Sequence, residues 1–434
     1  MKIIITLFVL SPFLLFAQQK TALFIGNSYT SVNNLPSLTS QLATSLGDTL
    51  VTGANTPGGY TLQGHTTNVT TLGNIALGTW DFVVLQDQSQ RPSFPPAQVA
   101  TDVYPYAEEL VSKIRQANQC AEPMFYMTWG RENGDQQNCS SYPPLCTYDG
   151  MQERLRTSYT EMADSNNASV SPVGVAWKYT RDNYPSIDLY ANDGSHPSMA
   201  GSYLAACVFY ASIYRKSPQG ASFISNLSQT TATTLQEVAK LIVIDSLATW
   251  RIGANDVVVD SIIMTPYSST CEIINFSTVN NATNFSWFFQ YGNENSYDAN
   301  GGYDSDTTDE YGATSNVQSP NIYYNVSGTH NVILIASNNC TSDTLTTQVT
   351  IDCIISIEEN ELGYKIIKGN EKVYIEFVNK TNKRIVMYDL NGKKIIEKQT
   401  GDKLVNFDLN LLPKITLITI EEGLNSSVTL KFIK

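Results

Sequence analysis

Between Thr21 and Trp250, short apolar runs alternate with longer amphipathic stretches, and this alternation constrains the fold more than any other feature of the chain. A short apolar run between turn residues is typical of a buried strand, whereas helical spacing of apolar residues indicates an amphipathic helix. Strands that alternate with helices pair in parallel, so the pattern predicts a three-layer α/β/α domain. The predicted strands are residues 22–25, 48–53, 81–86, 123–129 and 169–175, and the predicted helices are residues 35–46, 98–119, 149–165, 198–214 and 235–250.

The composition and the apolar pattern of the sequence change after Gly253. Short alternating runs rich in Thr, Asn, Ser, Val, Ile and Tyr, such as residues 323–326 and 331–336, indicate β-sandwich structure. Charge marks a further boundary, because residues 252–364 contain no Lys or Arg, whereas residues 365–434 contain about half of all basic residues. We therefore expect four segments, namely 1–17, an α/β domain at 18–252, a β-sandwich at 253–353 and a small antiparallel β-domain at 354–434.

The first seventeen residues have the order of a secretory signal peptide. Met1-Lys2 is followed by an apolar stretch from Ile3 to Phe16 and then by Ala17-Gln18, and we expect cleavage after Ala17. The alternative is a membrane anchor, but the apolar stretch is shorter than the roughly 20 residues that span a bilayer. The sequence therefore predicts export.

Export makes disulfide bonds possible among the seven cysteines. Cys139 and Cys146 bracket a polar loop that contains proline and form one predicted pair, and Cys271 with Cys340 forms another across the expected β-sandwich. Cys207 lies in an apolar helical pattern and is expected to be a packed thiol. No Cys/His spacing indicates a zinc site, and we expect neither metal nor cofactor.

Two short motifs carry the chemistry. Gly26-Asn27-Ser28-Tyr29 follows an apolar strand, so Ser28 is expected at the carboxyl edge of the sheet. Asp193-Gly194-Ser195-His196 places a carboxylate three residues before a histidine, where one turn lets the carboxylate accept a hydrogen bond from the ring. A serine needs such a base to become a nucleophile, and the substrate oxygen needs hydrogen-bond donors. The chain has three histidines, His65, His196 and His330, and His330 belongs to the β-rich region, which favours His196 as the base.

These motifs, in this order, resemble the SGNH or GDSL-like hydrolase superfamily of lipases and esterases over about half of the chain. The resemblance implies a flavodoxin-like hydrolase domain in which Ser28 is the nucleophile, His196 the general base and Asp193 the residue that orients it. It also implies a glycine whose N–H joins the oxyanion hole. Gly59 matches that glycine best, and Gly58 is the alternative.

This chain departs from the family at the third block, which is usually Gly-x-Asn-Asp. The sequence here is Val83-Val84-Leu85-Gln86-Asp87-Gln88-Ser89, without the asparagine that donates to the oxyanion. A glutamine amide can donate the same hydrogen bond from a longer stem, and Gln86 and Gln88, two positions apart, are expected to project to the same side. We assign the role to Gln88 and keep Gln86 as the alternative.

Each motif also has a structural interpretation. Gly-Asn-Ser-Tyr is a common turn, and Asp-x-x-His can simply precede a helix. His65 either faces the cleft or is a surface histidine whose hydrogen bonds are satisfied. Trp129 either stacks on a sugar ring or belongs to the core. The acidic run Asp298, Asp304, Asp306, Asp309 and Glu310 is expected to be a solvated loop, with a calcium site as the alternative.

The β-rich half carries two further resemblances. Trp287-Phe288-Phe289 and Asn339-Cys340 resemble polycystic-kidney-disease-like, immunoglobulin-type modules, although Gly292-Asn293 replaces the usual Asp-Gly. The final segment, with its Met387-to-Lys393 stretch and Lys-bounded last strand, resembles the C-terminal sorting domain of type IX secretion in Bacteroidetes; an ordinary adhesive sandwich is the alternative. That resemblance implies the type IX secretion machinery as a partner, and release or attachment at the cell surface.

Together these features predict an exported serine esterase that acts on an acylated glycan or small molecule, with removal of acetyl groups from carbohydrates favoured. A lipase or small-ester hydrolase is the alternative within the enzymes. A surface adhesion protein that uses the hydrolase fold as a scaffold is the alternative outside them. The net charge of −13 repels phosphate backbones, so nucleic acid is not an expected partner.

Overall fold

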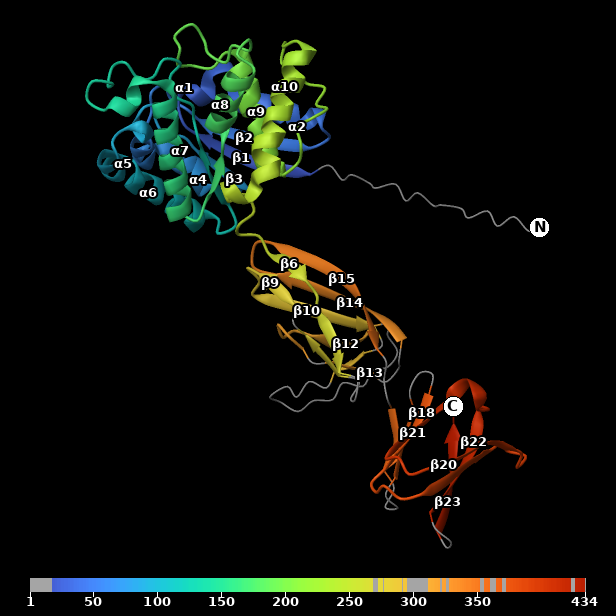
Figure 1. Ribbon diagram of the computed structural model, residues 1–434. Helices are drawn as coiled ribbons and strands as arrows, with labels where there is room; N and C mark the ends of the chain where they lie inside the picture. Colours follow the sequence, from blue (N-terminus) through green and yellow to red (C-terminus); the bar gives the residue numbers. More distant parts are fainter. Residues whose placement is uncertain are drawn as a thin grey trace, which may run out of the picture. The chain divides into compact units, whose positions relative to one another are not determined.

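The computed structural model describes residues 18–267, 272–275, 277–290, 292–294, 311–320, 322–324, 328–351, 355–359, 364–368, 372–422 and 426–433. The chain divides into two compact units, Met1–Ala254 and Asn255–Lys434 (Figure 1). The predicted signal peptide at residues 1–17 and the acidic run at 298–310 lie outside the described residues. No helix within the described ranges is long and apolar enough to cross a membrane.

A five-stranded parallel sheet forms the centre of the first unit. The strands are β1 (Gln19–Ile25), β2 (Thr49–Asn55), β3 (Phe82–Leu85), β4 (Glu122–Tyr126) and β5 (Ser169–Ser171). Their order is β2-β1-β3-β4-β5, and every neighbouring pair is parallel. The direction of the chain connections reverses between β1 and β3, and open α/β sheets bind their ligands at the carboxyl ends of the strands beside such a reversal.

Helices cover both faces of this sheet (Figure 1). The helices are α2 (Leu35–Ser45), α3 (Leu62–Thr67), α4 (Val69–Ala76), α5 (Pro96–Asp102), α6 (Tyr104–Ala117), α7 (Tyr148–Ser165), α8 (Val173–Asn183), α9 (Met199–Tyr214) and α10 (Gln229–Val243). On one face, α9 packs against α2, α8 and α10, and on the other α6 packs against α3, α4, α5 and α7. All four residues of β3 are buried, as expected for a strand covered on both sides. The structure thus confirms the predicted three-layer α/β/α fold.

Three predicted elements need correction. Residues 169–175 are not one strand, because β5 ends at Ser171 and α8 begins directly after Pro172. The predicted helix 98–119 is two helices, α5 and α6, since Pro105 in the first turn of α6 has no N–H to continue a preceding helix. The last seven residues of the predicted helix 235–250 form a 3₁₀ helix, Ile244–Trp250, with a kink at Ser246.

The second unit begins with antiparallel strands around a small apolar core. Its sheets have the orders β12-β10-β14-β15, β11-β13-β8-β7 and β6-β9. Trp287 in β10 is fully buried in this core and stacks on Phe289 at 5.7 Å between ring centroids. The strands are β6 (Val258–Ser261), β7 (Met264–Tyr267), β8 (Glu272–Asn275), β9 (Thr278–Asn280), β10 (Asn284–Gln290), β11 (Gly292–Glu294), β12 (Tyr311–Ser315), β13 (Ile322–Tyr324), β14 (Gly328–Ser337) and β15 (Ser342–Ile351).

Two four-stranded antiparallel sheets with a separate core follow, in the orders β16-β17-β18-β21 and β20-β19-β22-β23. The strands are β16 (Ile355–Glu359), β17 (Tyr364–Lys368), β18 (Lys372–Phe377), β19 (Lys383–Tyr388), β20 (Lys394–Thr400), β21 (Leu404–Asp408), β22 (Ile415–Glu422) and β23 (Ser426–Ile433). A tight turn with Gly392 at φ 79° joins β19 to β20, as the Asn-Gly pair predicts. Both sets of antiparallel sheets agree with the predicted β-sandwich modules.

Candidate active site

Ser28 lies at the carboxyl edge of the parallel sheet. β1 ends at Ile25, and after Gly26 and Asn27 the short helix α1 (Ser28–Ser31) begins at Ser28 itself. Asn27 caps this helix, because its side chain accepts a hydrogen bond from the Tyr29 N–H at 3.1 Å. The sequence thus turns from strand to helix at the serine and leaves it half-buried at the β1/β3 switch point.

Gln86, directly after β3, holds this turn in place. Its Oε1 accepts hydrogen bonds from the Asn27 N–H and the Thr30 hydroxyl, both at 3.0 Å, and its Nε2 donates to Asn27 Oδ1 at 2.9 Å. A Cβ on residue 26 would lie 2.5 Å from Gln86 Oε1, so only glycine allows this approach. The side chain of Gln86 is fully buried and its amide is already hydrogen-bonded. It therefore holds in place the turn that carries Ser28, called the nucleophile turn below, and is not free to donate to an oxyanion.

The loop that carries Asp193 and His196, called the base loop here, is a compact turn before α9. Gly194 has φ 63°, in the left-handed region that favours glycine, and its N–H donates to Ala191 O at 3.0 Å. Asp193 Oδ1 accepts from the N–H groups of Ser195 and His196 at 3.0 and 2.9 Å. These contacts orient the Asp193 carboxylate toward the imidazole of His196, three residues later.

The structure brings the three predicted triad residues together. His196 Nε2 lies 2.8 Å from Ser28 Oγ, and His196 Nδ1 lies 2.5 Å from Asp193 Oδ2. Burial acts to raise the pKa of Asp193, but the hydrogen bonds from the His196 ring and from two backbone N–H groups outweigh it and hold this pKa at about 2. Asp193 is therefore a carboxylate at all ordinary pH values. In that form it favours the tautomer whose Nδ1–H points at Asp193 and whose Nε2 accepts the serine proton.

Two backbone N–H groups, those of Ser28 and Gly59, are candidate donors for an oxyanion. Within the described part of the chain, neither the Ser28 N–H nor the Gly59 N–H has a hydrogen-bond acceptor. Gly59 is exposed and has φ 66° in a turn that the Tyr60 N–H closes on Pro57 O at 3.3 Å. Asn27 Nδ2 donates to Tyr60 O at 2.9 Å and so ties this turn to the nucleophile turn.

Gln88 and Gln86 do not project to the same side as expected, because β3 ends at Leu85 and the strand alternation stops there. The Gln88 Oε1 accepts from the N–H groups of Gln90 and Arg91 at 2.9 and 3.3 Å, which fixes the plane of its amide. Its Nε2 lies 3.1 Å from Gln90 Oε1 and 3.4 Å from Ser89 Oγ. The amide is thus oriented by its own loop, and its role as an oxyanion donor stays a prediction.

Asp87, between the two glutamines, is fully buried. Burial raises its pKa to about 6, although hydrogen bonds from the N–H groups of Gln88 and Leu62 and the charge of Arg91 act against this shift. Its Oδ1 accepts both N–H groups, at 2.7 and 3.0 Å. Its Oδ2 has no hydrogen-bond partner among the described residues, and Arg91 Nε is 3.8 Å from it.

His65 and Trp129 are both structural. His65 is fully buried, contrary to the surface alternative, with Nε2 2.9 Å from Gly26 O and Nδ1 2.7 Å from Thr71 Oγ1. It supports the nucleophile turn through its bond to Gly26 O. Trp129 is also fully buried and stacks on Trp177 at 3.8 Å, so it belongs to the core and is closed to a sugar ring.

Asn33 is a residue that the sequence analysis did not single out. Its φ of 56° places it in the left-handed region just after α1. Its Nδ2 donates to Ser198 O and Ser202 Oγ at 3.2 and 3.0 Å, at the start of α9 directly after the base loop. An asparagine after the nucleophile helix was the only signal in the sequence, since asparagine tolerates this conformation better than other residues.

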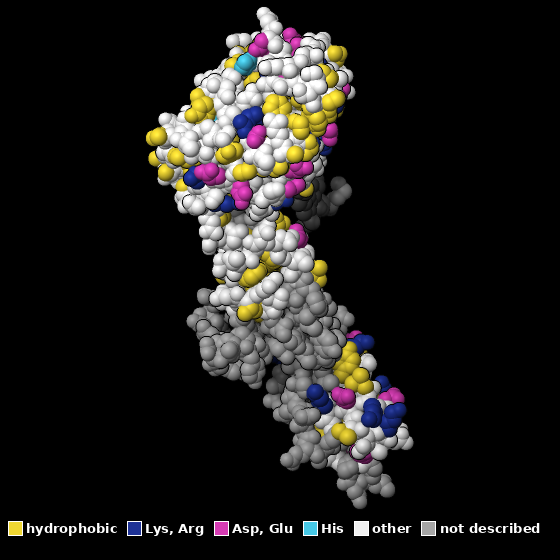
Figure 2. All heavy atoms as spheres, turned by 90° about the vertical axis from the view of Figure 1, so that its left-hand side faces the viewer, with side chains coloured by type: hydrophobic (Ala, Val, Ile, Leu, Met, Phe, Trp, Pro, Cys, Tyr) yellow, Lys and Arg dark blue, Asp and Glu magenta, His cyan; other side chains and the backbone are white. Residues whose placement is uncertain are grey.

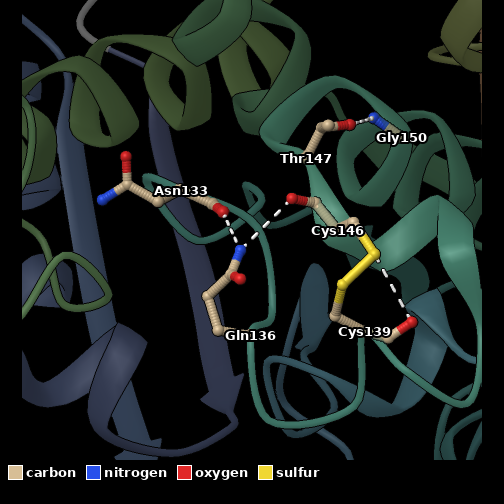
Figure 3. The surroundings of a disulfide bond; sticks show 6 residues. All are labelled: Asn133, Gln136, Cys139, Cys146, Thr147 and Gly150. Carbon is tan, nitrogen blue, oxygen red and sulfur yellow. Dashed lines mark hydrogen bonds between the residues drawn. A yellow bond between two sulfur atoms is a disulfide. The ribbon is translucent and has the colours of Figure 1, made fainter.

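The segment between β4 and α7 contains the predicted disulfide Cys139–Cys146, which the structure confirms (Figure 3). Gln136 Nε2 donates to Asn133 O and, at 3.2 Å, to Cys146 O, so the loop is closed by hydrogen bonds as well (Figure 3). Of the other predicted pair, Cys340 is disulfide-bonded and Cys271 lies outside the described residues.

This disulfide segment contacts two loops of the site. The Glu132 N–H donates to Gly194 O at 2.9 Å, which supports the base loop. Asp135 is fully buried and accepts from Gln90 Nε2 at 2.7 Å and from Arg131 at 3.1 Å, which anchors the loop after β3. The segment thus joins the base loop to the loop that carries Gln88.

The described residues contain no group of three or more His, Cys, Asp or Glu side chains that could hold a metal ion. Cys207 is buried and free, as predicted, and burial raises the pKa of its thiol. Acidic and basic side chains are interspersed on the face of the α/β unit that Figure 2 shows, without a large patch of one sign.

A three-layer α/β domain with a serine at the switch point, hydrogen-bonded to a histidine that is hydrogen-bonded in turn to a carboxylate, has the geometry of a serine-hydrolase site. No protein-family model matches the chain, and no curated protein matches it.

Several solved structures, however, are similar to this chain. A DUF4886 family protein from Bacteroides uniformis is 18% identical over 53% of this chain and 97% of its own, with a TM-score of 0.45. A protein from Slackia heliotrinireducens that is provisionally described as an SGNH hydrolase is 29% identical over 45% of this chain and 97% of its own, with a TM-score of 0.36. The acetyl xylan esterase AlAXEase is 15% identical over 44% of this chain and 99% of its own, with a TM-score of 0.35.

Proposed function

We propose that this chain is a serine esterase that hydrolyses acyl esters through a covalent acyl-enzyme. The observation that carries the proposal is the unbroken chain of hydrogen bonds from Asp193 through His196 to Ser28, with distances of 2.5 and 2.8 Å. A serine hydroxyl is a weak nucleophile, and a neutral imidazole held in the correct tautomer by a carboxylate is the group that activates it.

In the first half-reaction, Ser28 Oγ attacks the ester carbonyl while its proton moves to His196 Nε2. Asp193 stays ionised and stabilises the imidazolium that forms. The N–H groups of Ser28 and Gly59, with the Gln88 amide as a third donor, stabilise the oxyanion. His196 then gives its proton to the leaving alcohol. In the second half-reaction, His196 takes a proton from water and the hydroxide attacks the acyl group. The bond from the acyl carbon to Ser28 Oγ then breaks while His196 returns the proton to Ser28 Oγ, which releases the acid and restores the free enzyme.

The substrate class follows from the sequence rather than from the site. The signal-peptide pattern, the two β-modules and the resemblance of residues 354–434 to a type IX sorting domain support an exported enzyme that is released or attached at the cell surface. Such an enzyme meets polysaccharides more often than lipids, so we propose acetyl groups on carbohydrates as substrates. Lipids and small esters are the alternative.

The first experiment measures hydrolysis of p-nitrophenyl acetate by the full chain from Gln18, beside Ser28→Ala and His196→Ala. Ser31→Ala is a matched control, because Ser31 is exposed in the same short helix. We expect activity in the wild type and in Ser31→Ala only. Labelling by a fluorophosphonate should follow the same pattern. If the folded wild-type chain neither turns over the ester nor becomes labelled, the esterase proposal is wrong and the scaffold alternative is favoured.

A further inference from the structure

A second hydrogen bond joins the nucleophile turn to the base loop, beside the one that the triad makes. Tyr29 directly follows Ser28, and Ser195 directly precedes His196. The Tyr29 hydroxyl lies 2.6 Å from Ser195 Oγ, while Ser28 Oγ lies 2.8 Å from His196 Nε2. Two adjacent residues of one loop are thus bonded to two adjacent residues of the other, although more than 160 residues separate the loops, as the sequence separations of 166 and 168 show.

The base loop needs external support, because it lies near the surface. The Asp193 side chain is 51% exposed and that of His196 is 35% exposed. A hydrogen bond between exposed groups contributes little and does not by itself fix a loop. The geometry of the triad therefore depends on what holds the residues around His196.

Ser195 makes three of the hydrogen bonds that hold the base loop. Its N–H donates to Asp193 Oδ1 at 3.0 Å, its hydroxyl bonds to Tyr29, and its carbonyl accepts from Trp129 Nε1 at 3.0 Å. The other end of this support is rigid. Tyr29 is 3% exposed and stacks on Trp129 with ring centroids 4.7 Å apart, and Trp129 stacks in turn on Trp177.

The Tyr29 ring also contacts the base directly. Its centroid lies 5.5 Å from that of His196, with an angle of 67° between the rings, so the imidazole meets the tyrosine edge to face. Burial raises the pKa of Tyr29, although its hydrogen bonds with Ser195 and Ser89 act against this, so the hydroxyl stays protonated at neutral pH. A protonated hydroxyl can donate to Ser195 throughout the working range of the site.

From these contacts we propose that Tyr29 and Ser195 are positioning residues, which hold His196 at hydrogen-bonding distance from Ser28. The inference rests on the proposed function. Neither residue carries a step of the chemistry, since both act through the placement of the base. Small displacements of a catalytic group can cost about 10- to 100-fold in rate, so loss of this bond should lower kcat more than it changes KM.

The test compares Tyr29→Phe, Ser195→Ala, the double variant and Ser195→Thr in the full chain. Tyr29→Phe keeps the stack on Trp129 and removes only the hydroxyl, and Ser195→Thr keeps the hydroxyl that Ser195→Ala removes. Tyr214→Phe is the matched control, because Tyr214 is 5% exposed and its hydroxyl donates one hydrogen bond, to Thr49 O at 2.7 Å, at the start of β2. That position is at the opposite, amino end of the sheet.

We expect Tyr29→Phe and Ser195→Ala each to lower kcat on p-nitrophenyl acetate by about 10-fold with KM within about twofold. The double variant should be no worse than either single one, and Ser195→Thr and Tyr214→Phe should remain close to the wild type. Thermal unfolding should show similar small losses in Tyr29→Phe and Tyr214→Phe. Unchanged kcat in Tyr29→Phe, or additive losses in the double variant, would overturn the proposal.

A spectroscopic measurement separates this inference from the proposed function. The short bond from His196 Nδ1 to Asp193 should give a slowly exchanging, low-field imidazole proton signal in the NMR spectrum, whether or not the chain is an esterase. We expect this signal to broaden or disappear in Tyr29→Phe and Ser195→Ala and to persist in Tyr214→Phe. If the wild type has no Ser28-dependent activity, the esterase proposal alone is wrong. If the low-field proton signal persists in all variants, the positioning role of Tyr29 and Ser195 is wrong.

Discussion

Two aspartates in loops that support the nucleophile turn have opposite environments. Asp193 is half-exposed and accepts hydrogen bonds from the His196 ring and two backbone N–H groups, which hold its pKa at about 2. Asp87 is fully buried, has one oxygen without a hydrogen-bond partner among the described residues, and has its pKa raised to about 6. Burial and the donors around a carboxylate, rather than its closeness to a catalytic serine, set its charge.

The difference assigns different roles to the two groups. A carboxylate that stays ionised can orient and charge-stabilise an imidazole at every working pH, as Asp193 does. A carboxyl group that titrates near neutral pH changes the stability of its surroundings instead, since its charged form is penalised by burial. We therefore expect Asp193 to matter for turnover and Asp87 for stability.

The largest expected effect follows from changing Asp193 to asparagine. The amide keeps the oxygen that caps the Ser195 and His196 N–H groups but removes the charge and opposes the correct tautomer. We expect kcat/KM to fall by about 10³- to 10⁴-fold between pH 6 and 9, with no change in the melting temperature. Asp182→Asn is the control, because Asp182 is also 51% exposed, in an ion pair with Lys178 on α8. An Asp193→Asn variant with more than a tenth of the wild-type activity would remove the distinction between the two aspartates.

The next effect concerns Gln88, which directly follows Asp87 in its loop. Loss of one oxyanion donor typically costs about 10²- to 10³-fold in kcat, so Gln88→Ala should lose about 10²-fold if the amide donates to the oxyanion. Gln41→Ala in α2 is the control, because the Gln41 amide bonds only within its own helix, to Ser37. A loss of less than about threefold would show that Gln88 serves only its loop and that two N–H groups form the whole oxyanion hole.

The contrast between the two loops also separates what the sequence could predict from what it could not. Ser28 and His196 were identified because each stands in a short motif whose local turn already determines its geometry, as the Asp193-to-His196 hydrogen bond shows. The strands were located because apolar runs covered on both faces are distinctive. These signals are local, and tertiary packing leaves them intact.

The misassigned side chains depend on packing between distant segments. Gln86 was expected to point with Gln88, but its direction is set by its contact with Asn27, 59 residues away. The sequence left His65 open as a cleft or a surface residue, and its buried position depends on its bond to Gly26 O, 39 residues away. The strand predicted to reach residue 175 fails for a local reason, since Pro172 ends it and α8 begins. Tyr29 and Ser195 sit inside the motifs, yet only the structure shows that they are bonded.

A further prediction concerns the pH dependence of stability at Asp87. Its folded-state pKa is raised, so its contribution to stability is present below about pH 4 and is lost as the pH rises through about 6. Asp87→Asn lacks this titration, so the free energy of unfolding of the variant minus that of the wild type should increase by about 2 to 3 kcal/mol from pH 4 to pH 7. Urea unfolding of the α/β unit, followed by the near-ultraviolet signal of the stacked tryptophans, measures this difference. A flat difference for Asp87→Asn would mean that this carboxyl group is charged at pH 4.

The smallest expected effect tests the segment that joins both loops. Its disulfide, Cys139–Cys146, closes a loop with a sequence separation of only 7, so Cys139→Ser with Cys146→Ser should lower the free energy of unfolding by about 2 kcal/mol. A variant is preferable to a reducing agent, because Cys120 and Cys340 are also disulfide-bonded. We expect kcat to change by less than about threefold, since the bonds from Glu132 to Gly194 and from Gln90 to Asp135 persist without the disulfide. A loss of kcat above about 10-fold, with the melting temperature lowered only slightly, would instead mean that the disulfide sets the spacing of the two loops and that the environments of Asp87 and Asp193 are coupled through it.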